Sequence, residues 1–169
     1  MVFFSKNLPP WRYKKIATAL CVLLLSLAAG CLLQPCLFIR SNRGMEAVLP
    51  AVGRLPIKIY FIHSVQKTPV EEDLIIQDNI GGFLLQSTKY QSFGVGLPFL
   101  ATEGEFYQQG NFFVLEHMDR VFPFLSLRTG LGTQLRLEVA GREYRLYEQL
   151  PPGSLVDLYL APYYRRFFP

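Results

Sequence analysis

The sequence is poor in the residues from which metal and redox sites are built. It contains 3 cysteines and 2 histidines among 169 residues. All of the cysteines fall within an apolar stretch between Ile16 and Ile39, so the rest of the chain has no thiol. This excludes a disulfide framework and a zinc-thiolate site from that part, where roughly 120 residues can bury a core without such crosslinks.

Motifs of catalysis and nucleotide binding are also absent. The chain has no H-E-x-x-H, G-x-S-x-G, P-loop or C-x-x-C pattern. Its GVGLPF segment lacks the third glycine of a dinucleotide fingerprint. The net charge of +4 belongs largely to the N-terminal flank, and no basic stripe with interleaved aromatics occurs. We therefore expect no enzyme, no cofactor and no nucleic-acid partner.

An uncharged apolar run extends from Ile16 to Ile39 and exceeds the roughly 20 residues that cross a bilayer as a helix. Lysines and an arginine precede it, and such basic flanks remain in the cytoplasm. We expect a cytoplasmic segment at 1–15, a single transmembrane anchor in the inner (cytoplasmic) membrane at 16–39, and an extracytoplasmic remainder. The basic residues are Lys6, Arg12, Lys14 and Lys15.

Two alternatives to an uncleaved anchor are a cleaved signal peptide and a lipoprotein signal. The apolar region of a signal peptide is usually about 7 to 15 residues long, and no small-x-small site ends this run. The LAAGC segment before Cys31 is similar to a lipidation site. However, Leu-Leu follows this cysteine, and Ala28 stands where leucine is typical. We favour the uncleaved anchor.

The remainder reads as a linker followed by one β-rich domain. Residues 40–54 hold glycines and prolines and predict a tether with little regular structure. From residue 55 to 169, short alternating runs broken by turn residues predict an all-β fold, a small antiparallel β-sandwich or open barrel. The predicted strands cover 57–65, 70–77, 82–91, 112–118, 122–128, 134–140, 143–149 and 154–160.

The segment QLRLEVAGREYRLYEQ predicts the clearest hairpin. A tight turn with Gly141 and Arg142 at its centre matches the primed type that strand twist favours. This register sets Val139 opposite Tyr144 and Leu137 opposite Leu146, which places two apolar pairs on one face.

A second hairpin is predicted over IKIYFIHSVQKTPVEEDLII. If residues 66–69 form a four-residue loop, His63 lies opposite Glu72 at the end of a ladder of apolar pairs. One interpretation is a structural pair that fixes the register. The other is a recognition site at the end of the sheet, to which Ser64 and Pro69 also belong.

The stretch STKYQSFGVGLPF predicts a second candidate contact region. Thr88, Tyr90 and Ser92 alternate on one face of a strand. Glycines and a proline then interrupt the pattern, which predicts either a loop that contacts a ligand or partner, or a reversal between sheets. The residues of this loop are Phe93, Gly94, Gly96 and Pro98.

These two stretches carry a family resemblance. HSVQKTPVEED resembles an HSV-x-x-x-P-V-x-E signature, and TKYQSFGVGLP resembles T-x-[YF]-x-S-[FY]-G-A-G-L-P, with Val95 where alanine is usual. Both signatures belong to a family of small extracytoplasmic proteins of unknown function, and the resemblance covers residues 55–160. The motif positions are His63, Ser64, Val65, Pro69, Glu72, Thr88, Ser92, Phe93, Gly94, Gly96, Leu97 and Pro98.

The resemblance also implies partners. Members of the family are typically encoded beside TAXI-type TRAP transporters, which are sodium-coupled uptake systems with an extracytoplasmic solute receptor and a membrane permease. It therefore implies an accessory protein that contacts the receptor or the permease. The alternative is a free-standing module that binds or senses a small organic acid.

Two weaker hypotheses concern a metal and the C-terminus. His63, His117 and Glu72 have the residue types of a site with two histidines and one carboxylate, although such a site needs side chains that converge. The final LAPYYRRFFP suits either a membrane interface or a loose chain end.

Overall fold

The computed structural model describes residues 10–77, 80–92 and 104–168 of the chain. These residues divide into two compact units. The first unit comprises the N-terminal helix as far as Gln34 together with the C-terminal segment from Pro162. The second comprises Pro35–Ala161 and contains the β-sheets.

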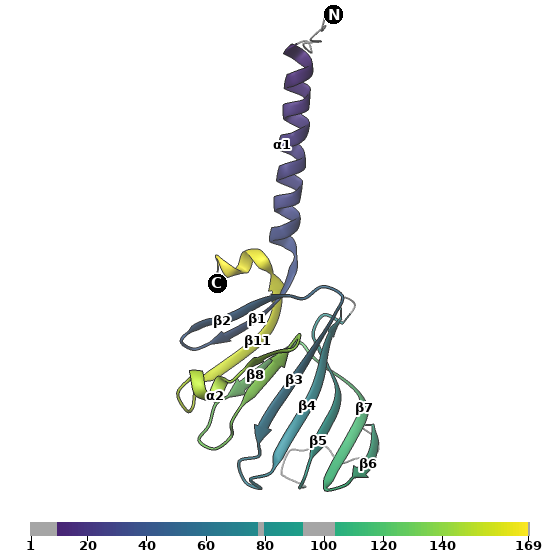
Figure 1. Cartoon of the computed structure of the whole chain (residues 1–169), viewed down its shortest axis with the longest axis vertical. Coiled ribbons are helices and arrows are strands. Elements are labelled where there is room, and N and C mark those ends of the chain that lie inside the picture. The colour runs from purple at the N-terminus through teal and green to yellow at the C-terminus, as the bar shows by residue number, and fades with distance from the viewer. Residues whose placement is uncertain (1–9, 78–79, 93–103, 169) are drawn as a thin grey trace, which may run out of the picture. The chain divides into compact units, whose positions relative to one another are not determined.

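The described part of the chain contains one long helix and a series of strands (Figure 1). Their order is α1 (Pro10–Leu33), β1 (Pro35–Ser41), β2 (Gly44–Pro50), β3 (Arg54–Ile62), β4 (Pro69–Gln77), β5 (Phe83–Tyr90), β6 (Glu105–Gln109), β7 (Phe112–Phe122), β8 (Phe124–Arg128), β9 (Arg136–Val139), β10 (Arg142–Tyr144), α2 (Leu146–Gln149), β11 (Leu155–Pro162) and the 3-10 helix η1 (Tyr163–Arg166).

Helix α1 accounts for only part of the apolar run. It ends at Leu33, and Pro35 explains this because proline disfavours helical backbone in the residue before it. Between Tyr13 and Leu33 the helix is long and apolar enough to cross a membrane. A signal sequence near the N-terminus has the same length and composition, so both interpretations fit this helix. The expected segment 16–39 is therefore wrong at its C-terminal end, because residues from Pro35 onward form β1.

The expected linker at 40–54 is also wrong in its structure. Strand β1 continues to Ser41 and pairs with β2, which begins at Gly44. The glycines and prolines that predicted irregular backbone lie at the boundaries of these strands, where they interrupt no ladder. Leu37 lies opposite Leu49 and is fully buried, so this hairpin is part of the β-unit.

Two antiparallel sheets form the β-unit and confirm the predicted all-β fold after one apolar helix. The smaller sheet has the order β2-β1-β11-β8, and the larger has the order β10-β9-β3-β4-β5-β7-β6. Buried side chains from both sheets form one apolar core. Among its members are Leu37, Ile39, Ile57, Ile59, Leu74, Phe83, Leu115, Leu137, Val156 and Leu158.

Several strands differ from the expected ones. Strand β6 was not predicted, and β7 continues to Phe122 instead of ending near residue 118. Pro123 separates β7 from β8, which belongs to the other sheet; proline suits this boundary because it cannot donate to a ladder. The strand expected at 143–149 is replaced by the end of β10 and the short helix α2, whose Leu146 is buried in the core.

The hairpin of β9 and β10 has a register different from the predicted one. Val139 pairs with Arg142, and Leu137 pairs with Tyr144. The two central residues of the turn are therefore Ala140 and Gly141, with φ angles of 51° and 77°, and positive values at both positions define a type I′ turn. Because the shift is two residues, the same side chains still face the core.

We expect Leu37→Ala to lower the free energy of unfolding by about 2–5 kcal/mol, because it leaves a cavity in a core that the other sheet also lines. Leu27→Ala is the matched control, since that helix side chain is 58% exposed. Urea denaturation of the full chain in detergent, followed by the β-sheet signal in circular dichroism, measures both. Equal stability of the two variants would contradict the assignment of β1 to the core.

Candidate functional site

The β3–β4 hairpin contains the first signature, and its register is four residues away from the predicted one. Phe61 pairs with Val70, and Ile59 pairs with Glu72. The loop therefore spans six residues, 63–68, and His63 lies in it instead of on the ladder. The predicted pairing of His63 with Glu72 is wrong, although Glu72 does lie on the same face as the apolar pairs, opposite Ile59.

His63 organises this loop from the inside. Its side chain is buried, and its Nδ1 atom accepts hydrogen bonds from the backbone N–H groups of Val65 and Gln66, at 3.3 and 3.2 Å. Its own N–H donates to the Thr68 carbonyl, and its carbonyl accepts from the Lys67 N–H, both at 2.9 Å. Lys67 has a φ angle of 55°, which closes the loop with a left-handed residue. The imidazole therefore acts as an internal acceptor, while Ser64 is exposed.

The described part of the second signature lies beside this loop. Ser92 Oγ donates to Gln66 Oε1 at 3.3 Å, which joins the end of β5 to the β3–β4 loop. Thr88 and Tyr90 are fully buried on the core face and pair with Glu72 and Val70 of β4. The remaining predicted contact residues lie outside the described residues: Phe93, Gly94, Gly96 and Pro98.

Glu72 is an acid on the core side of the large sheet. Its neighbours across the ladder are Ile59 and Thr88, which are both buried. Burial raises the pKa of the Glu72 carboxyl, and the positive charge of Arg120 opposes this increase. Protonation at acidic pH therefore removes part of the cost of keeping this group away from water.

The second histidine does not join the first. A metal site of His63, His117 and Glu72 needs converging side chains, but His117 is exposed and has a φ angle of 57°, whereas His63 is buried. Its Nδ1 lies 3.6 Å from Glu105 Oε2 of the edge strand β6. Among the residues that the structure describes, no group of three or more His, Cys, Asp or Glu side chains is placed to hold a metal ion.

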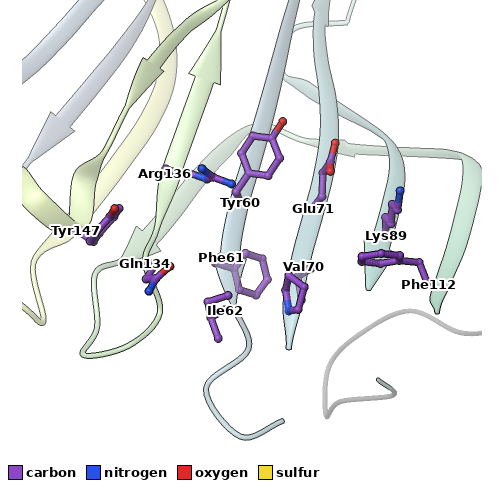
Figure 2. Close-up of a pocket in the computed structure, with 11 residues that line it drawn as sticks. Tyr60, Phe61, Ile62, Val70, Glu71, Lys89, Phe112, Gln134, Arg136 and Tyr147 are labelled. Carbon is purple, nitrogen blue, oxygen red and sulfur yellow. The ribbon is translucent and has the colours of Figure 1, made fainter. Parts of the chain in front are cut away.

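The outer face of the large sheet carries a hollow of about 270 Å³ (Figure 2). Side chains alternate along a strand, so Tyr60, Glu71 and Lys89 point away from the core that Ile59 and Glu72 face. The residues that line the outer hollow are Tyr60, Phe61, Ile62, Pro69, Val70, Glu71, Lys89, Phe112, Gln134, Arg136 and Tyr147.

Two cations lie against aromatic rings in the outer hollow. The Arg136 guanidinium is 4.6 Å from the centre of the Tyr60 ring, and Lys89 Nζ is 4.6 Å from the centre of the Phe112 ring. Arg136 is also 3.3 Å from Glu143, whereas Lys89 forms no salt bridge with any described residue. Lys89 therefore offers a positive charge that a ligand or partner can neutralise.

The acid of the outer hollow is already paired. Lys58 Nζ lies 2.7 Å from both Glu71 Oε1 and Asp73 Oδ1. Burial lowers the pKa of Lys58, but hydrogen bonds to the two carboxylates outweigh burial and raise it. Burial and the Glu71 charge also raise the pKa of Tyr60, so its phenol stays protonated and donates to Glu138 at 3.4 Å.

The outer hollow is therefore suited to hold a carboxylate or another anion beside aromatic surface. Lys89, which has no salt bridge to any residue in the described part of the chain, supplies attraction, and the rings supply apolar contact area. Of the predicted contact residues that the structure describes, Pro69 lines the outer hollow and the others do not. The predicted residues were chosen from motifs, whereas this surface is assembled mainly from single, mostly half-buried positions on neighbouring strands. The signal in the sequence was weak: Tyr60, Glu71 and Lys89 are polar or aromatic positions that alternate with core residues.

The fold and the outer hollow define a two-sheet β-domain with one polar and aromatic face, after an apolar helix that is a possible single-pass anchor or signal sequence. Residues 57–146 match the domain of unknown function DUF1850, and the chain belongs to this family. No curated protein and no solved structure matches the chain. The expected resemblance to a family of unknown function is thereby confirmed, while the link to a transporter stays a proposal.

The match covers the large sheet much better than the small one. It begins in β3 and ends at Leu146, so it includes the outer hollow except for Tyr147. It leaves out β1, β2 and β11, which are three of the strands of the smaller sheet. The large sheet is therefore the part of this chain that defines the family.

We expect His63→Ala to lower the free energy of unfolding by about 1–3 kcal/mol, because the backbone N–H groups of Val65 and Gln66 lose the buried acceptor that organises the loop. His63→Asn is the matched variant, since its Oδ1 occupies a position similar to that of Nδ1 and restores the acceptor. Urea denaturation measures both. If asparagine destabilises the protein as much as alanine does, the acceptor role is wrong.

Proposed function

We propose that this chain is a membrane-tethered extracytoplasmic accessory protein of a TAXI-type TRAP transporter. In this role α1 crosses the inner membrane once, with its N-terminus in the cytoplasm, and the β-domain contacts the solute receptor or the permease. The role is non-catalytic and needs no cofactor. The link to this class of transporter is supported by the two signatures in the sequence.

The character of α1 supports the tether. Its described side chains are apolar around the whole circumference from Ile16 to Leu33, except for Thr18 and Ser26, and they are exposed within the protein. A helix that is apolar on all sides requires an apolar environment, which a bilayer provides. Thr18 and Ser26 donate their hydroxyl hydrogens to backbone carbonyls of the helix, which reduces the cost of placing them in lipid.

The outer hollow is the observation that carries the partner-binding role. It joins partly exposed aromatic rings to Lys89, a cation that forms no salt bridge with any described residue. Aromatic residues and arginine are enriched where proteins contact one another, because they combine large apolar area with hydrogen bonding. We therefore place the contact on the outer face of the large sheet, and not on His63 and Glu72, which face inward.

Photo-crosslinking tests this role in native membranes. A photo-reactive amino acid replaces Phe112 in the outer hollow, and a matched chain carries it at Leu131, which is 85% exposed and does not line the hollow. We expect receptor or permease peptides to be crosslinked from position 112 and not from position 131, as identified by mass spectrometry.

The combined change Lys89→Ala and Arg136→Ala should reduce that crosslink. The matched pair Arg54→Ala and Arg142→Ala removes two exposed cations that do not line the outer hollow, and it should leave the crosslink unchanged. If position 112 captures no transporter subunit while the transporter is well expressed, the accessory role fails.

The dimensions and charge of the outer hollow favour a second candidate function. A volume of about 270 Å³ with Lys89 at one side is suited to a small organic acid. In this case the chain is a free-standing module that binds or senses the solute.

Thermal unfolding of the full chain in detergent tests this second function with succinate, citrate and benzoate. A ligand at a hundredfold excess over its Kd stabilises the folded state by about 2.7 kcal/mol, which raises the melting temperature measurably. We expect Lys89→Ala to abolish the increase and Arg54→Ala to preserve it. If none of the three acids raises the melting temperature of the unmodified chain, carboxylate binding is not the function.

A further inference from the structure

The C-terminal segment belongs to the same compact unit as helix α1. The backbone N–H of Tyr163 donates to the carbonyl of Gln34 at 2.9 Å, directly after the last turn of the helix. The 3-10 helix η1 begins at this point and continues the chain beyond β11. In Figure 1 the yellow segment after β11, which contains η1, accordingly lies next to the end of α1. The two segments are far apart in sequence but are joined by a hydrogen bond.

The exposed side chains of this segment are aromatic and cationic. Tyr164, Phe167 and Phe168 are 37%, 58% and 70% exposed. Arg165 and Arg166 are exposed as well, and no acidic residue follows Asp157 in the sequence. We call residues 163–168 the tail.

Internal contacts give the tail a defined conformation. The Phe167 N–H donates to the Tyr164 carbonyl at 3.0 Å, and the rings of Tyr163 and Phe167 meet edge to face at 5.8 Å. Large apolar rings are thus held at the surface, where water is a poor solvent for them.

The end of α1 is also where a membrane boundary has to fall if the helix spans the bilayer. The candidate span ends at Leu33, and the polar Gln34 comes next. Tyrosine is enriched at this depth because its ring is apolar and its hydroxyl is polar. Arginine at the same depth can place its guanidinium among lipid phosphates.

We propose that the tail is a second membrane contact, which lies in the headgroup layer with its aromatic rings toward the acyl chains and its arginines on lipid phosphates. This inference rests on the tether in the proposed function, because α1 has to stay in the bilayer for its end to mark the boundary. The contact restrains the chain on both sides of the β-domain, since β1 follows α1 and β11 leads into the tail.

Tryptophan fluorescence of the full chain in phosphatidylcholine vesicles with phosphatidylglycerol tests the inference. The sequence has a single tryptophan, Trp11, which lies in α1 and reports on the helix in the unmodified chain. A second chain, with Trp11→Phe and Phe167→Trp, reports on the tail. A third, with Trp11→Phe and Leu131→Trp, is the matched control in the β-domain. Lipids brominated near the headgroup quench a tryptophan at that depth.

We expect quenching of the residue 167 probe and of Trp11, and little quenching of the residue 131 probe. Arg165→Gln with Arg166→Gln should weaken the contact by roughly fivefold for each arginine on an anionic surface, and should reduce quenching of the residue 167 probe. Arg142→Gln, on β10, should leave that quenching unchanged.

The remaining outcomes overturn the inference in different ways. If Trp11 is quenched and the residue 167 probe is not, the tail does not contact lipid although the tether is correct. If the residue 167 probe is shielded only when transporter subunits are added, the tail binds protein and not lipid. If Trp11 itself is not quenched in the intact chain, α1 is not in the bilayer, and both the tether and the tail contact are wrong.

Discussion

The end of the helix at Gln34 and Pro35 is the constraint on which the rest of the structure depends. Proline lacks a backbone N–H and disfavours helical backbone in the preceding residue. The apolar run is therefore divided into a helix that is exposed along its length and a strand that is buried in the core. If the helix continued through this point, the smaller sheet would lose β1, which lies between β2 and β11.

Hydrophobicity alone was a poor guide at this boundary. Leu37, Phe38 and Ile39 suit a membrane helix by composition, and they are fully buried in the β-unit instead. Lipid and a protein core are both apolar, so transfer free energies do not separate the two environments. The backbone restriction at Pro35 separates the membrane-type helix from the buried strand, and this proline can be read from the sequence.

The period of two predicted the faces of the strands better than it predicted their partners. Glu72 was expected to share a face with the apolar pairs of this hairpin, and it lies there opposite the buried Ile59. The registers were wrong because they depend on residues with positive φ, and these were non-glycine residues, Lys67 and Ala140. Non-glycine residues adopt this conformation rarely. The sequence therefore favoured a shorter loop between β3 and β4, and a turn with Gly141 as its first central residue instead of its second. Both registers were shifted by an even number of residues, so the predicted core-facing side chains still face the core.

The outer hollow was beyond motif-based prediction. Its charged and aromatic side chains come from β3, β4, β5, β7 and β9 and from the start of α2, and they are distant in sequence. Each of them is an ordinary half-buried or exposed residue of its own strand or helix. They become a site only through the order of the strands in the large sheet, and strand order is not encoded in any single stretch. His63 is the reverse of this. It belongs to a conspicuous sequence motif, but its side chain has a structural role, because it accepts hydrogen bonds that hold the β3–β4 loop together.

The strand order of the smaller sheet has a consequence for how the chain is made. Among the described strands, β1 is the first to be synthesised, and its neighbour β11 is the last. Pairing of strands so distant in sequence is slow, because a long loop must close before the contacts form. The larger sheet consists of strands that are complete before β11 exists, so it has the opportunity to fold first. Buried residues of β1, such as Leu37, then need protection from aggregation until the C-terminus has emerged.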